Sequence, residues 1–177
     1  MMTSEPQSTK PLVTNDFWAN RRNRGLVYAM LALAPIGFLD ALYLTIEHYL
    51  GRIPPCSIIS GCEKVTTSKY SVIFGVPTSL LGTLYYLAVI VALVYFLDSK
   101  KTIVIKLVSM FTLAGFLFSG WLMYLMFFVI HAVCQYCLLS ALSSTGLFII
   151  GVLVLKSLRC TEQRQTDPRP SAGEGGR

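Results

Sequence analysis

The sequence predicts an all-α integral membrane protein, a bundle of four transmembrane helices with a capping loop on the non-cytoplasmic side. Of its 177 residues, 54% are apolar and only 14% are charged, whereas a soluble domain carries about 25% charged residues. The apolar residues are gathered in four runs, each near the roughly 20 residues that a helix needs to cross a bilayer. The basic residues flank these runs, so the formal charge of +6 indicates membrane orientation rather than nucleic-acid binding.

The chain divides into one membrane domain and two polar tails. The domain covers residues 25–158, and its expected spans lie at about 27–50, 77–97, 102–130 and 137–158. Residues 1–24 and 159–177 are too poor in apolar side chains to form a core, so we expect two disordered tails. The outer loop, residues 51–76, is half apolar. A freely solvated loop would be more polar, so we expect short helical pieces that cap the bundle.

Lysine and arginine residues predict the orientation of the four spans. Four of them precede span one, the turn between spans two and three holds Lys100 and Lys101, and several more follow span four. The opposite side has only Arg52, Lys64 and Lys69. Because positive residues near the ends of spans favour the cytoplasmic side, both termini are expected to be cytoplasmic.

Four of the five cysteines then lie on the non-cytoplasmic face as two pairs. Cys56 and Cys62 lie in the outer loop, and Cys134 and Cys137 lie at the start of span four. That face is the oxidising side, where disulfides persist. If a helix begins at Cys137, both sulfurs of the second pair lie near its N-terminus, where the helix dipole lowers the pKa of a thiol. Cys160 falls on the cytoplasmic side as a free thiol.

Two cysteine pairs in series can relay two electrons by thiol–disulfide exchange. A soluble dithiol can reach the loop pair, and an acceptor dissolved in lipid, for which a quinone is the natural candidate, can reach the second pair. Two alternatives remain open: static disulfides in a non-enzymatic four-span scaffold, and a four-cysteine metal site. The two residues between Cys134 and Cys137 suit zinc, but the five between Cys56 and Cys62 exceed the usual two to four, so we expect no metal.

The cysteines and several residues near them follow an order that is similar to that of a known protein family over about residues 27–158. The matching residues are Cys56-x5-Cys62, then Ser68, then Tyr70-Ser71-x-x-Phe74-Gly75-x-Pro77, and finally Cys134-x-x-Cys137 opening the last span. This pattern resembles the vitamin K epoxide reductase family. DsbB-type disulfide generators perform a similar reaction, but their Cys-x-x-Cys lies in the first outer loop.

The resemblance implies a four-helix bundle around a quinone, capped by the loop. For bacterial members it implies a plasma-membrane (bacterial inner-membrane), multi-pass enzyme that oxidises a soluble thioredoxin-like or DsbA-like protein. The electrons pass to ubiquinone or menaquinone, which supports disulfide bond formation outside the cytoplasm. Many bacterial members carry a fused thioredoxin-like domain. This chain ends at residue 177, soon after span four, so its redox partner is expected to be a separate protein.

The resemblance also implies a role for each cysteine of the two pairs. Cys56 would meet the thiol of the partner, Cys62 would exchange with Cys134, and Cys137 would face the quinone ring. Ser68 would form a hydrogen bond near the quinone or the cysteine pair. An ordinary helix cap in the loop is the alternative for Ser68.

Two positions depart from the vertebrate members, which share an Asn at the start of span two and a Tyr four residues after the last active cysteine. Here these positions are Thr78 and Ala141. Thr78 would take the place of that Asn at the quinone site. The departures favour ubiquinone or menaquinone as the acceptor, with reduction of vitamin K quinone or its epoxide as the alternative activity.

A few residues within the spans are further candidates. Asp40 lies near the middle of span one, where a carboxyl is costly and should face the bundle or a cavity. It is either a proton acceptor near a bound ligand or a protonated or hydrogen-bonded packing residue. His131 either assists thiolate formation at Cys134 or is an interfacial histidine without a role. Four aromatic residues either wall a quinone site or simply pack within the bundle: Tyr85, Tyr86, Phe116 and Trp121.

Overall fold

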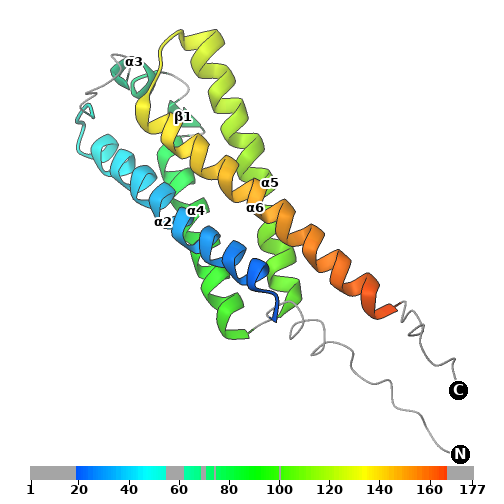
Figure 1. The fold of residues 1–177 in the computed structure, drawn as a ribbon. Helices are drawn as coiled ribbons and strands as arrows, with labels where there is room; N and C mark the ends of the chain where they lie inside the picture. Colours follow the sequence, from blue (N-terminus) through cyan, green and yellow to red (C-terminus); the bar gives the residue numbers. More distant parts are fainter. Residues whose placement is uncertain (1–18, 55–61, 69–70, 74, 100, 167–177) are drawn as a thin grey trace, which may run out of the picture.

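In the computed structural model, four long helices run up and down to form one bundle (Figure 1). The structure describes residues 19–54, 62–68, 71–73, 75–99 and 101–166. The long helices are α2 (Arg21–Tyr49), α4 (Thr78–Ser99), α5 (Thr102–Tyr124) with its π-helical continuation η2 (Leu125–Ile130), and α6 (Gln135–Thr166). The loop between α2 and α4 contains the short helix α3 (Cys62–Thr66) and the strands β1 (Val72–Ile73) and β2 (Val76–Pro77).

The predicted four-helix membrane class is confirmed, because all four helices are long and apolar enough to cross a bilayer. Two helices extend beyond the expected spans into segments expected to be disordered. α2 begins at Arg21, and α6 continues to Thr166. The start of α2 is capped by Asn20, whose side-chain oxygen accepts the N–H of Arg22 at 3.0 Å. Apolar runs mark the part of a helix that lies in lipid, and the helix itself continues where caps and helix-forming residues allow.

The loop folds over one end of the bundle, and a glycine sets its starting direction. Gly51 has a φ of 64°, and its N–H donates to the carbonyl of His48 at 3.2 Å. The next N–H, of Arg52, donates to the carbonyl of Glu47 at 3.0 Å. This pair of bonds is a Schellman motif, which ends α2 and keeps His48 and Arg52 at the same end of the bundle.

The second half of the loop forms a small hairpin that was not predicted. β1 and β2 are antiparallel, and Val72 pairs with Pro77. The second span was expected to begin at residue 77, but Pro77 belongs to the hairpin and α4 begins at Thr78. The hydroxyl of Thr78 donates to the carbonyl of Ser71 at 3.0 Å. That bond fixes the hairpin to the first turn of α4.

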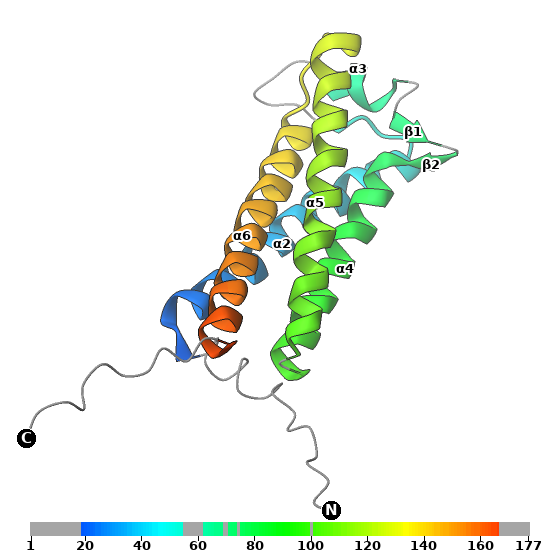
Figure 2. The same cartoon turned by 90° about the vertical axis from the view of Figure 1, so that its right-hand side faces the viewer.

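Each long helix packs against two neighbours: α2 and α5 both contact α4 and α6 (Figure 2). Most residues of the main buried apolar cluster come from the first halves of α2 and α5 and from the second halves of α4 and α6. They include Val27, Met30, Leu93, Phe96, Ile105, Val154 and Leu158. Because neighbouring helices run in opposite directions, these halves share one end of the bundle. The apolar core therefore closes the end away from the loop.

Hydrogen bonds between helices join the bundle at several levels. Such bonds each contribute about 0.6 kcal/mol on average in membrane proteins. In this bundle the interhelical bonds include Ser157 to Asn23 at 2.6 Å, Thr45 with Thr83 at 3.1 Å, Tyr86 to the carbonyl of Ser140 at 2.8 Å, and Ser144 to Ser119 at 2.7 Å.

We expect Gly37→Ala to destabilise the bundle. A methyl group at Gly37 would collide with the ring of Tyr86, and that ring is held by its hydrogen bond to Ser140. Overpacking of this kind costs about 1–3 kcal/mol. Thermal unfolding in detergent should therefore show a lower midpoint. Gly120→Ala is the matched control, because nothing lies within 4 Å of a methyl group at that position; an equal loss in both variants would contradict this packing account.

Candidate functional site

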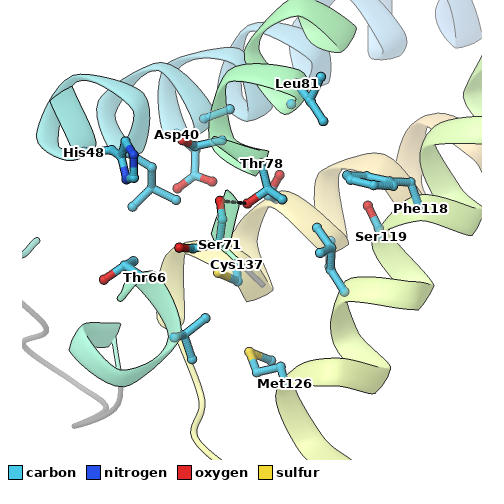
Figure 3. Close-up of a pocket in the computed structure, with 18 of the residues that line it drawn as sticks. Asp40, His48, Thr66, Ser71, Thr78, Leu81, Phe118, Ser119, Met126 and Cys137 are labelled. Atoms are coloured by element: carbon cyan, nitrogen blue, oxygen red, sulfur yellow. Dashed lines mark hydrogen bonds between the residues drawn. The ribbon is translucent and has the colours of Figure 1, made fainter. Parts of the chain in front are cut away.

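The bundle is hollow at the end that the loop covers. A cavity of about 510 Å³ lies there, between the four helices and beneath the loop. Its volume falls within the roughly 300–1,000 Å³ of small-molecule sites. The polar residues on its wall include Asp40, His48, Arg52, Ser68, Ser71, Thr78, Tyr85, Tyr86 and Cys137. Figure 3 shows the side chains of Asp40, Thr78 and Cys137 gathered around this space.

The first turn of α6 is built around the sulfur of Cys134. The carbonyl of Cys134 accepts the N–H of Leu138 at 3.1 Å, and its Sγ accepts the N–H of Cys137 at 3.4 Å. The sulfur thus takes the place that a serine or aspartate oxygen usually has at a helix N-cap. The helix was expected to begin at Cys137, but it begins at Gln135. Both sulfurs still lie in its first turn.

This position makes Cys134 an acidic thiol. Hydrogen bonds from the thiol of Cys137 and from the backbone N–H groups of Cys137 and Tyr136 stabilise a thiolate on Cys134. They lower the pKa of the Cys134 thiol from its usual 9 to about 7, although burial acts in the opposite direction. A thiolate at Cys134 is therefore substantially populated near neutral pH, and the thiolate is the reactive form.

Cys62, Met126 and Cys134 form a small buried cluster between the loop and the bundle. Cys62 opens α3 and is 1% exposed, and Cys134 is completely buried. The backbone N–H of Cys134 donates to Sδ of Met126 at 3.4 Å. Cys137 packs against this cluster and also lines the cavity. Cys137 therefore lies between the buried cluster and the cavity.

The oxidation state differs between the two sides of this cluster. Cys62 is engaged in a disulfide, whereas Cys134 and Cys137 are free thiols. Cys56, the fourth cysteine of the expected site, lies outside the described residues. Cys160 is a free and exposed thiol on α6, and it lies toward the C-terminal end of that helix, away from Cys134 and Cys137.

The path from α5 to α6 depends on a feature that the sequence did not reveal. The last turns of α5 widen into η2, and His131 follows with a φ of 49°. The N–H of Ala132 then donates to the carbonyl of Met126 at 3.4 Å. The side chain of His131 is exposed. The role that the structure shows for this residue is to end η2. Neither the π-helical geometry of η2 nor the left-handed conformation of the next residue can be predicted from an apolar sequence.

The two hydroxyl residues expected near a quinone both line the cavity. The Ser68 hydroxyl donates to the carbonyl of Val65 at 2.8 Å, which is a local bond at the end of α3. The Thr78 hydroxyl donates to the carbonyl of Ser71 at 3.0 Å. Both donors are thus engaged by the loop, while each oxygen keeps the capacity to accept. Ala141 also lines the cavity.

The aromatic candidates for the wall divide into two groups. Tyr85 and Tyr86 line the cavity. Phe116 and Trp121 are not among the described residues that line it. Phe116 instead stacks on Phe148 with ring centroids 4.6 Å apart, and Trp121 is 58% exposed. Both lie on the apolar run of α5, where the sequence cannot distinguish a lipid-facing aromatic residue from one that faces the cavity.

We expect Cys137→Ala to raise the pKa of Cys134. The variant removes the thiol whose hydrogen bond is the main cause of the low value. In a Cys160→Ala background, the ultraviolet absorbance of the Cys134 thiolate should appear as pH rises through about 7. With Cys137→Ala added, the midpoint should move to higher pH. An unchanged midpoint would show that the Cys137 thiol does not stabilise the Cys134 thiolate.

Comparison with protein-family models identifies the chain. The model of the vitamin K epoxide reductase family matches residues 28–152, which is most of the chain. The matched range runs from α2 through the loop to α6 and includes all four cysteines of the two pairs. The chain therefore belongs to the vitamin K epoxide reductase family, whose members are oxidoreductases.

Proposed function

We propose that this chain is a thiol–disulfide oxidoreductase that carries two electrons from a soluble thioredoxin-like or DsbA-like protein to a membrane quinone, ubiquinone or menaquinone. The observation that supports this most is the order of three cysteines in space. Cys62 packs with Cys134 under the loop, and Cys137 lies between that cluster and the cavity. An electron pair can thus move from loop to cavity by exchange between neighbouring sulfurs.

In the outer half of the reaction, a thiolate of the soluble partner attacks the Cys56–Cys62 disulfide at Cys56. The released Cys62 thiolate then attacks Cys134 in an oxidised Cys134–Cys137 pair, and the Cys137 thiolate leaves. The second thiolate of the partner breaks the partner–Cys56 bond and leaves with the partner as its disulfide. The released Cys56 thiolate attacks Cys62, which closes the Cys56–Cys62 bond again and frees the Cys134 thiolate. A thiol of low pKa leaves readily, so the hydrogen bonds that lower the pKa of Cys134 favour this last step.

In the inner half, the Cys134–Cys137 dithiol closes to a disulfide and releases two electrons and two protons. The pattern in the structure, with Cys62 in a disulfide and two free thiols at the start of α6, corresponds to the state that precedes this step. A quinone accepts two electrons and two protons when it becomes a quinol. Cys137 is the cysteine of this pair that opens on the cavity.

The cavity suits a quinone head group in both size and chemistry. Its walls are mainly apolar, with Leu44, Leu81 and Phe118 among them. The hydroxyls of Ser68 and Thr78 donate to loop carbonyls, so their oxygens are arranged to accept. A quinol hydroxyl donates hydrogen bonds where a quinone carbonyl accepts them. We therefore assign Ser68 and Thr78 to binding of the head group. Their accepting oxygens suit the quinol product better than the quinone.

The key test is quinone reduction by the purified protein with a reduced thioredoxin-like protein as donor. Cys62→Ser and Cys137→Ser should each lower the rate to the uncatalysed background, because each interrupts the relay. Cys160→Ser should retain the full rate, since that thiol lies outside the path. Cysteine accessibility and thermal unfolding would establish that each variant is folded.

The outcome of that test separates this function from its two alternatives. A scaffold with structural disulfides predicts no quinone reduction by the wild type and lower stability in the cysteine variants. A reductase of vitamin K epoxide predicts consumption of the epoxide with a dithiol as the only reductant. Turnover of the epoxide at a rate equal to that of the quinones would favour the second alternative.

We also propose that the two cysteine pairs face the outside of the plasma membrane and that both termini are cytoplasmic. A membrane-impermeant maleimide should then label Cys56, the cysteine proposed to meet the soluble partner, in intact, mildly reduced cells and leave Cys160 unlabelled until the membrane is permeabilised. Cys160 is exposed in the protein itself, so protection would come from the membrane. Labelling of Cys160 in intact cells would reverse the orientation.

A further inference from the structure

Asp40 is the acidic residue among the described residues that line the cavity. It lies in the second half of α2 and is 7% exposed. Its Oδ2 is completely buried and has no hydrogen-bond partner among the described residues. Figure 3 shows its carboxyl directed into the space that Cys137 also lines. The carboxyl also interacts electrostatically with the thiols of Cys134 and Cys137.

The hydrogen bonds of its neighbours make this carboxyl unusual. Ser68, Ser71, Thr78 and Tyr86 on the same wall all donate to backbone carbonyls. An ionised carboxyl without a partner is costly at membrane depth, so the neutral acid is the form that this site accommodates. A neutral carboxylic acid has one O–H to donate and one oxygen to accept. Such a group can pass on a proton and take up another.

The proposed reaction requires a proton to cross this space. When the Cys134–Cys137 dithiol reduces a quinone, two S–H bonds break, one S–S bond forms and two O–H bonds form on the quinol. The Cys134 thiol has a pKa of about 7, so in the thiolate form that is populated near neutral pH its proton has already been released before the disulfide closes. An equivalent proton then enters from water. The proton of Cys137, however, leaves a sulfur that faces the cavity and must reach an oxygen inside it.

We propose that Asp40 is the proton-transfer group of this cavity, which gives its proton to a quinone oxygen and takes the proton of the Cys137 thiol as the disulfide closes. Its carboxyl is unchanged after each turnover, so no further reactant is needed. The inference rests on the proposed function and assigns one more catalytic residue to it. It accounts for a buried carboxyl that contributes no described hydrogen bond to the fold.

Other ionisable groups around the cavity are less suited to this transfer. Those on its described wall are His48 and Arg52 at the end of α2 and Tyr85 and Tyr86 on α4. The Tyr86 hydroxyl is engaged with Ser140. The Tyr85 hydroxyl is buried without a hydrogen-bond partner in the described part of the chain, but its ring packs against Gly115 and Phe111 on the α5 side. The α5 residues on the wall carry no ionisable side chain.

The test compares Asp40→Asn, Asp40→Glu and Thr45→Val in the quinone reduction assay. Asp40→Asn keeps the shape of the side chain and removes its exchangeable acid. A positioned acid or base typically contributes about 100- to 10,000-fold, so kcat should fall by about 100-fold or more while KM for the quinone changes by less than about threefold. Asp40→Glu, which keeps a carboxylic acid, should have a kcat at least about tenfold higher than that of Asp40→Asn. Reduction of the Cys134–Cys137 pair by the soluble dithiol should proceed at the wild-type rate in all variants.

Thr45→Val is the matched control on the same helix. Thr45 is also buried and polar, with bonds to Ala41 and Thr83, but it does not line the cavity. Its variant should keep kcat within about threefold of the wild type. A loss equal to that of Asp40→Asn would show that any buried polar change on α2 impairs turnover, and would overturn the inference.

A second readout does not depend on turnover. The infrared difference spectrum between the oxidised and reduced Cys134–Cys137 pair should contain a carboxylic-acid C=O band that shifts, because Asp40 senses the neighbouring thiols. That band should be absent from Asp40→Asn. No such band in the wild type, or the same band in Asp40→Asn, would overturn the inference even if the variant lost activity by misfolding.

The outcomes also distinguish this inference from the function on which it rests. Quinone reduction at the wild-type rate by Asp40→Asn would overturn the role of Asp40 and leave the cysteine relay intact. A wild-type protein that reduced no quinone would overturn both. Equal loss in Asp40→Asn and Asp40→Glu, together with lower unfolding temperatures in both, would make Asp40 a packing residue.

Discussion

The hydrogen bonds that the first turn of α6 gives to the sulfur of Cys134 connect the fold to the chemistry. A helix that starts at a membrane boundary needs partners for its first N–H groups, and here one partner is a thiol. The bond from Cys137 therefore helps to begin the helix and also stabilises a thiolate. A serine would cap the helix equally well. Cysteine at this place is better explained by redox chemistry than by helix capping.

The bundle separates stability from function along its length. The end away from the loop is filled by large apolar side chains and joined by the bond between Ser157 and Asn23. The other end holds the cavity, and the Schellman turn at Gly51, α3 and the hairpin form its cover. The widened η2 contributes Met126 to the sulfur cluster. A close-packed end can thus support a hollow one.

Much of this architecture could be predicted from the sequence, because apolar runs and cysteine spacing are local patterns. They gave the four spans and the family, and the resemblance to that family implied that the loop meets the start of α6. Such local patterns do not specify tertiary details. Nothing in Leu125–Ile130 distinguishes a π-helical turn from an α-helical one, and only the packed bundle shows that Trp121 is exposed while Tyr86 lines the cavity. For Asp40, the sequence placed a carboxyl in the membrane, but its position beside Cys137 depends on how α2 packs against α6.

The central claim is that electrons pass between Cys62 and Cys134, and it can be tested by trapping that contact. In the double variant Cys56→Ser, Cys137→Ser, neither pair can close on itself. Because Cys62 and Cys134 share one buried cluster, mild oxidation of the folded protein in detergent should join them. Peptide mass spectrometry should then detect a Cys62–Cys134 disulfide in most molecules, with Cys160 unmodified. If the two cysteines remained free, or linked only after unfolding, the relay through this contact would be contradicted.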